Sequence, residues 1–453
     1  MRSPLSLCWP WGIFRIKLWL RNLVGVLCRT FYLFIRESNK IYEAMNKRIG
    51  ILTYHGVNNY GAVLQAYGLC QVMKDLGLDV RIIDYIPVWM RNQYYPSRIL
   101  LRLFIRPWQK VLSVVHKDII STKNTHRRQD SIAISEEGIG LSTIKILRYF
   151  MPLIRIKRLT NFRKKFQLFR KEYLPLTEKK YLRSEQLSSL QNEFDCIFVG
   201  SDQVWNVNIN RNDLSYFLNF LSNRAITKRV SYAASVGDTF DFGQLRESVE
   251  SLLKGFSKIS VRDEKSQDTI SSMINFKPMI VLDPSLIADY DYITPPRVIG
   301  QPYVFMYFLQ NPNRYKLVIS ILRDVFPYHR FITVLHPIKG ARLINSGPLQ
   351  WLSLIKHADF VCTDSFHGTC FAIKNKKRFV TLPINSARVH RIKDLLFRIK
   401  LADRFISDLS IKTIEEKIKD LVHNEIDYET SYIELDNLID ASRQYIIEAI
   451  NAN

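Results

Sequence analysis

The stretch from His357 to Phe379 holds the residues best suited to acid–base chemistry, because a short apolar run leads into a polar turn and then into an apolar helical pattern. Thr363-Asp364-Ser365 forms the turn and supplies a helix N-cap. Open α/β sheets bind ligands at turns that leave the carboxyl ends of parallel strands. His367 is therefore the first candidate for proton transfer. The alternative is that Asp364 and Ser365 only cap the helix, with His367 a core histidine.

A second polar turn lies near the start of the chain. The residues at 49–54 are expected as a buried strand, and the loop at 55–61 leads into an amphipathic helix at 62–76. Asn59 and Gly61 put free backbone N–H groups at the start of this helix, which suits a phosphate or carboxylate. The loop lacks the GxGxxG pattern, so a dinucleotide is not indicated. A simple tight turn is the alternative.

Polar strand ends recur further along the same expected sheet. A strand at 195–199 leads into the polar turn at 200–206. Three more strands are expected, at 229–237, 259–263 and 281–284. Arg262 lies near the end of the second of these. Three polar strand ends on one sheet favour a ligand site more strongly than any one of them does.

A second α/β unit is expected from Pro302 onward. Its strands are expected at 303–308, 331–336, 359–362 and 379–383, and its helices at 315–325 and 347–358. Strands that alternate with helices predict parallel sheets, so we expect an α/β protein with two Rossmann-like domains. Helices at 389–400 and 411–449 end the chain, and the last is long enough to pack back across the first domain.

A chain of 453 residues is too long for one ordinary core, so several parts are expected. Residues 1–44 are a basic apolar leader, and residues 45–295 are the N-terminal Rossmann-like domain with a basic helical insertion at about 86–190. Residues 296–400 are the C-terminal Rossmann-like domain. The helices at 401–453 are expected to pack on the first domain.

The net charge of +23 is concentrated in two segments. Residues 1–44 carry seven Lys and Arg against two Glu, and residues 98–183 carry twenty-one against six acids. These cations interrupt apolar runs, as at 99–106 and 144–158, which favours an anionic membrane surface as a partner. Solvated helical faces are the alternative. No zinc-finger, RNP-like or helix-turn-helix pattern is present, so we do not expect nucleic-acid binding.

The leader is apolar and aromatic but is broken by Arg15, Lys17, Arg21 and Arg29, so no run reaches the length of a membrane-spanning helix. We interpret it either as an interfacial amphipathic helix or as an extension upstream of a natural start at Met45. The six cysteines include no CxxC pair and fit reduced thiols. A cytoplasmic protein is expected, either free or bound peripherally to the inner membrane surface.

Six short sequences occur in order along the chain: NYGAVLQAY at 59–67, GSDQVWN at 200–206, SYAASVG at 231–237, SVRDEKS at 260–266, LDPSL at 282–286 and DSFHGT at 364–369. Together they resemble the polysaccharide pyruvyl transferase family over about residues 48–400. The resemblance implies a glycosyltransferase-B-like pair of Rossmann domains that face a cleft. It also implies transfer of pyruvate from phosphoenolpyruvate onto two hydroxyls of a sugar, which makes a cyclic ketal.

The resemblance places His367 in the site as an acid or base and Arg262 as an anion clamp. Asp364 is a candidate to orient the imidazole, with helix capping as its other role. The further candidates for substrate contact are Asn59, Gly61, Ser201, Asp202, Ser365 and Arg388. The implied chemistry needs an acid, fixed cations and hydrogen bonds, so we expect no metal and no cofactor besides phosphoenolpyruvate as donor substrate.

Two other functions remain open. A glycosyltransferase that uses a nucleotide sugar would share the architecture, and a non-catalytic member of a polysaccharide assembly complex would keep the fold without turnover. For the transferase, the expected partners are phosphoenolpyruvate and a lipid-linked sugar acceptor of a capsule or exopolysaccharide.

Overall fold

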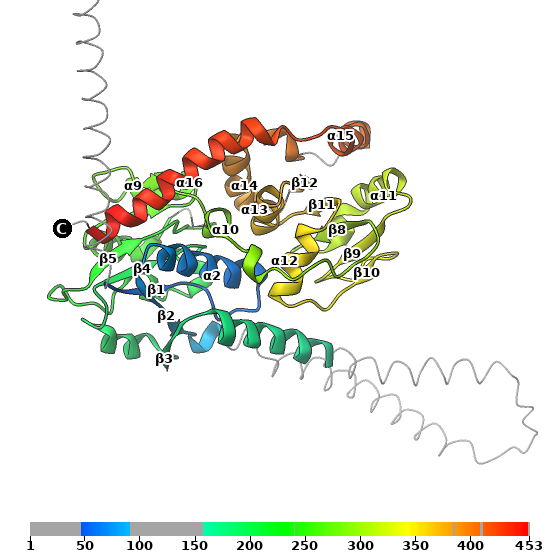
Figure 1. Ribbon diagram of the computed structural model, residues 1–453. Helices are drawn as coiled ribbons and strands as arrows, with labels where there is room; N and C mark the ends of the chain where they lie inside the picture. Colours follow the sequence, from blue (N-terminus) through cyan, green and yellow to red (C-terminus); the bar gives the residue numbers. More distant parts are fainter. Residues whose placement is uncertain (1–46, 91–156, 240, 384–385, 408–410, 452–453) are drawn as a thin grey trace, which may run out of the picture.

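The computed structural model contains two parallel five-stranded sheets joined by a shared layer of helices (Figure 1). The described residues are 47–90, 157–239, 241–383, 386–407 and 411–451. The leader and most of the basic insertion lie outside them, so the predictions made for those segments remain predictions.

The first sheet has the strand order β3-β2-β1-β4-β5. In that order its strands are Leu176–Tyr181, Asp79–Tyr85, Arg48–Leu52, Cys196–Val199 and Lys228–Ser231. The central strands β1 and β4 are buried almost throughout, as parallel strands covered on both faces must be. The order reverses between β1 and β4, and a doubly wound sheet binds its ligand in the crevice at such a point.

The second sheet repeats this arrangement in the order β10-β9-β8-β11-β12. Its strands are Arg342–Leu343, Arg330–Thr333, Tyr303–Tyr307, Phe360–Thr363 and Arg378–Thr381. Here the order reverses between β8 and β11, directly before the turn that holds Asp364. The predicted α/β fold class, with two Rossmann-like domains, is therefore confirmed.

A small third sheet extends the first domain. β6 (Ser260–Val261) pairs with β7 (Met279–Ile280), and a bridge from Ala234 to Val261 connects β6 to the segment after β5. Further described helices of this domain include α7 (Val207–Asn210), α8 (Arg246–Leu253) and α9 (Glu264–Ser271). The short β6 brings Arg262 to the same edge of the first sheet as the ends of β4 and β5.

Helix α2 (Tyr60–Asp75) follows β1 and lies between the two domains, against α10 (Pro284–Ile287), α12 (Pro348–Lys356) and α13 (Phe366–Lys374) (Figure 1). The Tyr60 ring stacks on Trp351 with 5.3 Å between ring centroids. Tyr60 also donates a hydrogen bond to the carbonyl of Ser346. One continuous hydrophobic core therefore includes residues of both domains. This core fixes the positions of the two sheets, and of the crevices where their strand order reverses, relative to each other.

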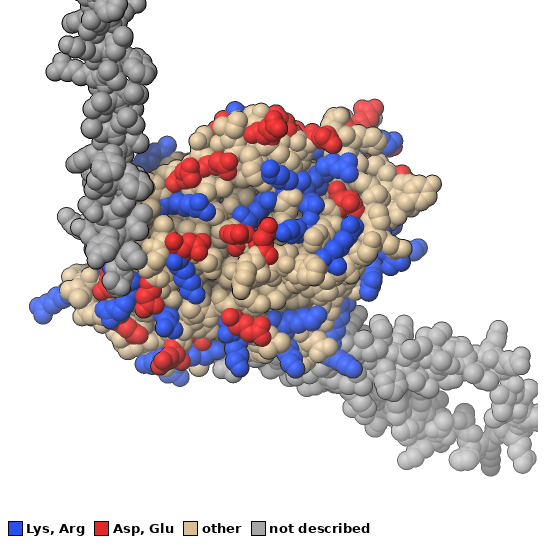
Figure 2. Space-filling model, in the orientation of Figure 1, with Lys and Arg blue, Asp and Glu red and all other residues tan. Residues whose placement is uncertain are grey.

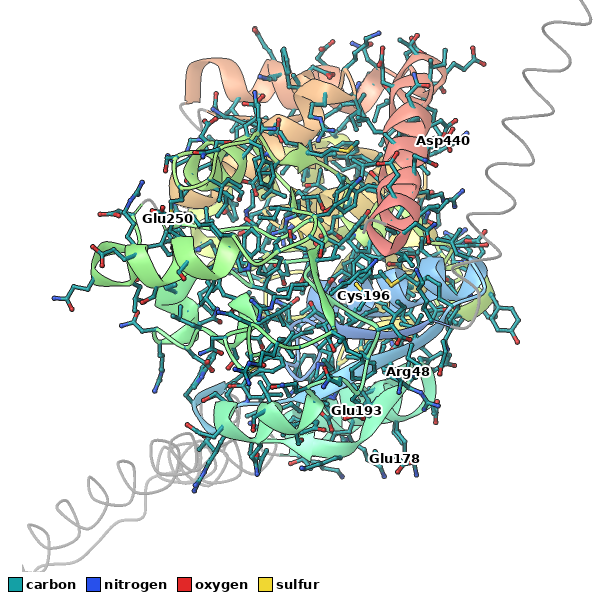
Figure 3. The ribbon with its side chains drawn as sticks, turned by 90° about the vertical axis from the view of Figure 1, so that its left-hand side faces the viewer. Arg48, Glu178, Glu193, Cys196, Glu250 and Asp440 are labelled. Carbon is teal, nitrogen blue, oxygen red and sulfur yellow. The ribbon has the colours of Figure 1, made fainter. Side chains whose placement is uncertain are left out.

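The C-terminal helices separate onto the two domains. Helix α16 (Tyr428–Asn451) crosses back over the first domain, where Tyr445 Oη donates to the Ser231 carbonyl at 2.9 Å. Figure 3 shows this helix, labelled at Asp440, above the strand that begins at Cys196. Helix α15 (Ile411–His423) instead packs on α11 (Lys316–Val325) of the second domain. The expectation that all of residues 401–453 pack on the first domain is therefore wrong for α15.

The structure also corrects the expected end of the insertion. Residues 176–181, which we assigned to the insertion, form β3 at the edge of the first sheet. This strand reads LTEKKY and exposes three charged residues, because an edge strand has a neighbour on one side only. The preceding helix at 157–173 packs Phe166 and Phe169 into the core.

Candidate active site

His367 lies in the first turn of α13, at the edge where the two domains meet. Ser365 is the N-cap of this helix and accepts a hydrogen bond from the Gly368 N–H at 3.3 Å, as the sequence predicted. The imidazole faces the start of α2, where Gly61 lies so close that a Cβ atom would overlap the imidazole Nδ1. Only glycine allows this approach of α2 to His367.

Asp283 lies beside the other ring nitrogen of His367. Its Oδ2 is 3.6 Å from Nε2, and the carboxylate is fully buried. Ser285 donates to its second oxygen from both the backbone N–H, at 3.0 Å, and Oγ, at 2.7 Å. Burial alone would raise the pKa of Asp283, but the charges of His367 and Arg262 and the hydrogen bonds from Arg262 and Ser285 hold it well below its usual range. The Asp283 carboxylate is thus held beside the His367 imidazole.

Arg262 binds the same oxygen of Asp283 that lies beside His367. Its Nη1 donates to Asp283 Oδ2 at 2.9 Å, and its Nη2 donates to Asp202 Oδ1 at 3.3 Å. The Arg262 side chain is only 1% exposed, and its guanidinium lies over the Phe366 ring, 4.6 Å from the centroid. Burial alone would lower the pKa of Arg262, but the two carboxylates raise it, so the guanidinium remains charged.

This placement bears on the prediction that Arg262 is an anion clamp for the substrate. Both terminal nitrogens already bind carboxylates, and the group is buried. In the described state Arg262 therefore has the geometry of an ion pair that positions Asp283. The carboxylates that bind Arg262, Asp202 and Asp283, come from turns that are distant in the sequence.

Ser201 and Asp202 follow β4 and complete the cluster, which we call the His367 cluster: Ser201, Asp202, Arg262, Asp283 and His367. Ser201 Oγ lies 2.9 Å from Asp283 Oδ2 and donates to one acceptor, either this oxygen or the Ala233 carbonyl at 3.1 Å. The turn after β4 thus contributes to the same site as the turn before α13, as the sequence analysis expected of polar strand ends.

Asp364 has a different set of partners. Its carboxylate accepts from the N–H groups of Leu309, at 2.6 Å, and Gln310, at 3.0 Å, and from Tyr315 Oη, at 3.0 Å. These bonds connect the turn after β11 to the loop after β8. Burial raises the pKa of Asp364. The orienting position that we had considered for Asp364 is therefore occupied by Asp283, and Asp364 fixes the loops of the second domain.

The remaining candidates lie around the cluster. Asn59 caps α2 by accepting from the Ala62 N–H at 3.3 Å. Arg388 lies in α14 (Ser386–Arg398), but its side chain is outside the described part of the structure. Arg391, one turn further along α14, places its guanidinium 5.9 Å from the Phe366 ring centroid. The guanidinium groups of Arg262 and Arg391 therefore both lie near the Phe366 ring, which precedes His367 in α13.

Asp283 is the functional residue that the sequence analysis missed. The signal was present, since LDPSL was one of the six ordered sequences and Asp283 follows a strand and precedes a proline at a helix start. Its role depends on the distance to His367, which no local pattern reveals.

Two features are absent from the part of the chain that the structure describes. No group of three or more His, Cys, Asp or Glu side chains in those residues is arranged to hold a metal ion. Within the same ranges, no helix has the length and apolar character needed to cross a membrane.

Comparisons with known proteins identify a family for most of the chain. The family model for polysaccharide pyruvyl transferase matches residues 59–386. No curated protein matches the sequence.

Several solved structures are similar over most of the chain. The UDP-GlcNAc 2-epimerase from Neisseria meningitidis bound to UDP-GlcNAc is 13% identical, with 90% of this chain and 100% of that chain covered and a TM-score of 0.44. The S. aureus MnaA–UDP structure is 12% identical, with 89% and 95% covered and a TM-score of 0.45. The glycotransferase of kitacinnamycin is 10% identical, with 90% and 98% covered and a TM-score of 0.43.

Proposed function

Because the chain belongs to the polysaccharide pyruvyl transferase family, we propose that it moves the pyruvyl group of phosphoenolpyruvate onto two hydroxyls of a sugar and forms a cyclic ketal. The family match supports a transferase that acts on a polysaccharide or its precursor. The observation that carries the finer proposal is the buried pairing of His367 with Asp283 and Arg262 at the ligand edges of both sheets.

The proposed reaction needs one proton at carbon. Protonation of the methylene carbon of phosphoenolpyruvate leaves a cation at the neighbouring carbon, which the first sugar hydroxyl attacks with loss of its proton. The bond from this carbon to the phosphate oxygen then breaks, and the second hydroxyl closes the ring and loses its proton. One of the two released protons balances the proton added to carbon, and the other leaves with phosphate.

We assign the proton donor to His367. Asp283 stabilises the charged imidazole, because its ionised carboxylate lies 3.6 Å from Nε2 in a buried site where charges interact strongly. Arg262 holds that carboxylate by a hydrogen bond of 2.9 Å, and Ser201 Oγ lies 2.9 Å from the same oxygen. The same imidazole can take up a hydroxyl proton after it has given its own to carbon, so one residue serves both halves of the reaction.

The donor carries a phosphate and a carboxylate, and both need cations. Since Arg262 is engaged inside the cluster, we assign donor contact to α14, where Arg391 lies beside Phe366 and Arg388 lies one turn earlier. The N–H groups at the start of α2, after Asn59, are a further site for an anionic group.

Labelled substrates test the proposal against its alternatives. The full chain is incubated with a panel of sugar acceptors and either phosphoenolpyruvate labelled in its pyruvyl carbons or a labelled nucleotide sugar. We expect label in the acceptor only from phosphoenolpyruvate, and a loss of about 10²-fold or more in His367→Asn with the fold intact. Transfer from the nucleotide sugar would establish a glycosyltransferase, and transfer from neither donor would favour a non-catalytic assembly role.

We further propose that the protein acts on a lipid-linked acceptor of a capsule or exopolysaccharide at the inner membrane surface. The basic leader and the basic residues at 98–183 support this proposal by their charge and apolar neighbours. The full chain and a form that starts at Met45 are sedimented with anionic vesicles at low and high salt. Salt-sensitive binding of the full chain is the expected result, whereas soluble protein under all conditions would contradict it.

A further inference from the structure

A basic cavity lies next to the His367 cluster, at the carboxyl ends of β1 and β2. It has a volume of about 490 Å³, which lies within the range of small-molecule sites. Its walls come from the loop after β1, the end of β2, the helix at 157–173 and β3. Figure 2 shows Lys and Arg side chains gathered along the lower edge of the molecule, where this helix runs.

Four cationic side chains line the cavity: Arg163, Arg170, Lys171 and Lys180. Among the described residues that line the cavity, Asp84 is the one carboxylate, and His55 Nε2 contacts it at 3.0 Å. Although burial acts to raise the pKa of Asp84, the hydrogen bond from His55 and the nearby cations hold that pKa below its usual value. The cavity therefore carries a clear excess of positive charge.

The packing of the helix at 157–173 explains why its Arg163 and Arg170 side chains face the cavity. Its Phe166 and Phe169 side chains are buried in the core, which fixes the rotation of the helix. Arg163 and Arg170 lie on another face of the helix, at a spacing of two turns, and both line the cavity. Arg170 also donates weak hydrogen bonds to the Val57 carbonyl, at 3.4 Å, and to Asn58 Oδ1, at 3.3 Å. The basic wall is thus bound to the loop after β1.

The same loop connects the cavity to the His367 cluster. Asn58 lines the cavity, and Gly61 packs against the imidazole of His367. Residues three positions apart are separated by at most about 11 Å even in a fully extended chain. The cavity and the His367 imidazole therefore flank the same short loop after β1.

We propose that this cavity binds the phosphate groups of a glycosyl diphosphate acceptor. The inference rests on the proposed pyruvyl transfer, since the donor anions are assigned to α14 and a neutral sugar acceptor would not require four cations. Phosphate oxygens accept charge-assisted hydrogen bonds from Arg and Lys, and a diphosphate offers enough oxygens for several of them. The sugar on the diphosphate then extends toward His367, and the carrier group extends outward.

Inorganic pyrophosphate serves as the probe, because its binding requires no turnover. The full chain is titrated with pyrophosphate and, separately, with phosphoenolpyruvate in a calorimeter. Arg163→Gln and Lys180→Gln remove cavity cations. Lys164→Gln and Lys179→Gln remove the same charges from the neighbouring positions, outside the lining of this cavity.

We expect each cavity variant to weaken pyrophosphate binding about tenfold, the scale of one charge-assisted hydrogen bond. The two matched controls should bind pyrophosphate as the wild type does, and all four should bind phosphoenolpyruvate unchanged. Equal losses in variants and controls, or no pyrophosphate binding by the wild type, would overturn the proposal. If pyrophosphate binding depends on the cavity cations but the protein transfers no pyruvyl group, the anion site stands and the proposed function is wrong.

The carrier is identified by two further titrations. A short prenyl diphosphate and UDP are compared, and each should lose affinity in Arg163→Gln and Lys180→Gln if its diphosphate occupies the cavity. Tighter binding of the prenyl diphosphate assigns the acceptor to a lipid carrier, whereas tighter binding of UDP assigns it to a nucleotide. If neither depends on these cations, the diphosphate assignment is wrong.

Discussion

Replacement of Asp283 by Asn tests the pairing at the centre of the proposed mechanism. Asn keeps the size of the side chain and an oxygen that can accept from Ser285, but it removes the charge beside His367. Two unit charges 3.6 Å apart attract by about 4.6 kcal/mol at an effective dielectric constant of about 20. Since each 1.36 kcal/mol corresponds to about a tenfold change in rate, the upper limit of the loss is about 10³-fold.

The assay is phosphate release from phosphoenolpyruvate in the presence of acceptor, measured across pH. We expect Asp283→Asn to lower kcat by about 10²- to 10³-fold, because the proposed proton donor loses the negative charge beside it. Loss of one partner of a buried ion pair also destabilises the folded protein by about 3–5 kcal/mol. Folding of the variant must therefore be verified by circular dichroism and by donor binding.

A matched variant separates the charge from general disturbance. Ser285→Ala removes a charge-assisted hydrogen bond of 2.7 Å to the other oxygen of Asp283 but leaves the charged carboxylate in place. Its effect should stay between about 10- and 10²-fold and below that of Asp283→Asn, since hydrogen bonds to charged groups contribute about 1.5–3 kcal/mol. If folded Asp283→Asn binds the donor and turns over within tenfold of the wild type, His367 does not depend on Asp283 and the reasoning is refuted.

Three further changes follow from the geometry. Arg262→Lys should lower kcat more than it raises the donor KM, because the planar guanidinium holds Asp283 and Asp202 at once; a rise in donor KM alone would restore the anion-clamp role. Gly61→Ala should lower turnover by about 10²-fold in a folded protein, because its Cβ would displace the His367 imidazole; unchanged kinetics would contradict the close approach of α2. Burial raises the pKa of Asp394 to about 6, above about 3.9 in the unfolded chain, so its stabilising contribution is present at low pH and is lost as pH rises through about 6. Asp394→Asn should therefore raise the free energy of unfolding by about 1 kcal/mol at about pH 7, a value reduced because the side chain is partly exposed to solvent. Thermal melts should show that this gain vanishes below about pH 4.

The sequence was sufficient to predict the alternation of strands and helices and the location of His367. Buried parallel strands such as β1 and β11 are continuous apolar runs, and the N-cap Ser365 marks the helix that carries His367. The edge strands β3 and β10 escaped prediction, because a strand with one neighbour tolerates charged residues and loses its apolar signature.

The partners within the site could not be predicted from the sequence. Arg262 has acidic residues next to it in the sequence, but its guanidinium turns inward to Asp202 and Asp283. Asp364 lies close to His367 in the sequence, yet its carboxylate bonds to the loop after β8. Which acid meets which base is decided by how the turns converge, and that depends on strand order and on the packing of α2 against α13.

The most direct test of the account is the reaction in heavy water with phosphoenolpyruvate and a sugar acceptor that offers two neighbouring hydroxyls. Proton transfer to the methylene carbon from a solvent-exchanging His367 predicts a ketal whose methyl group carries one deuteron, with one phosphate released for each ketal formed, and it predicts loss of both products in His367→Asn. Phosphate release without a ketal, or a ketal formed at the wild-type rate by folded His367→Asn, would contradict the account.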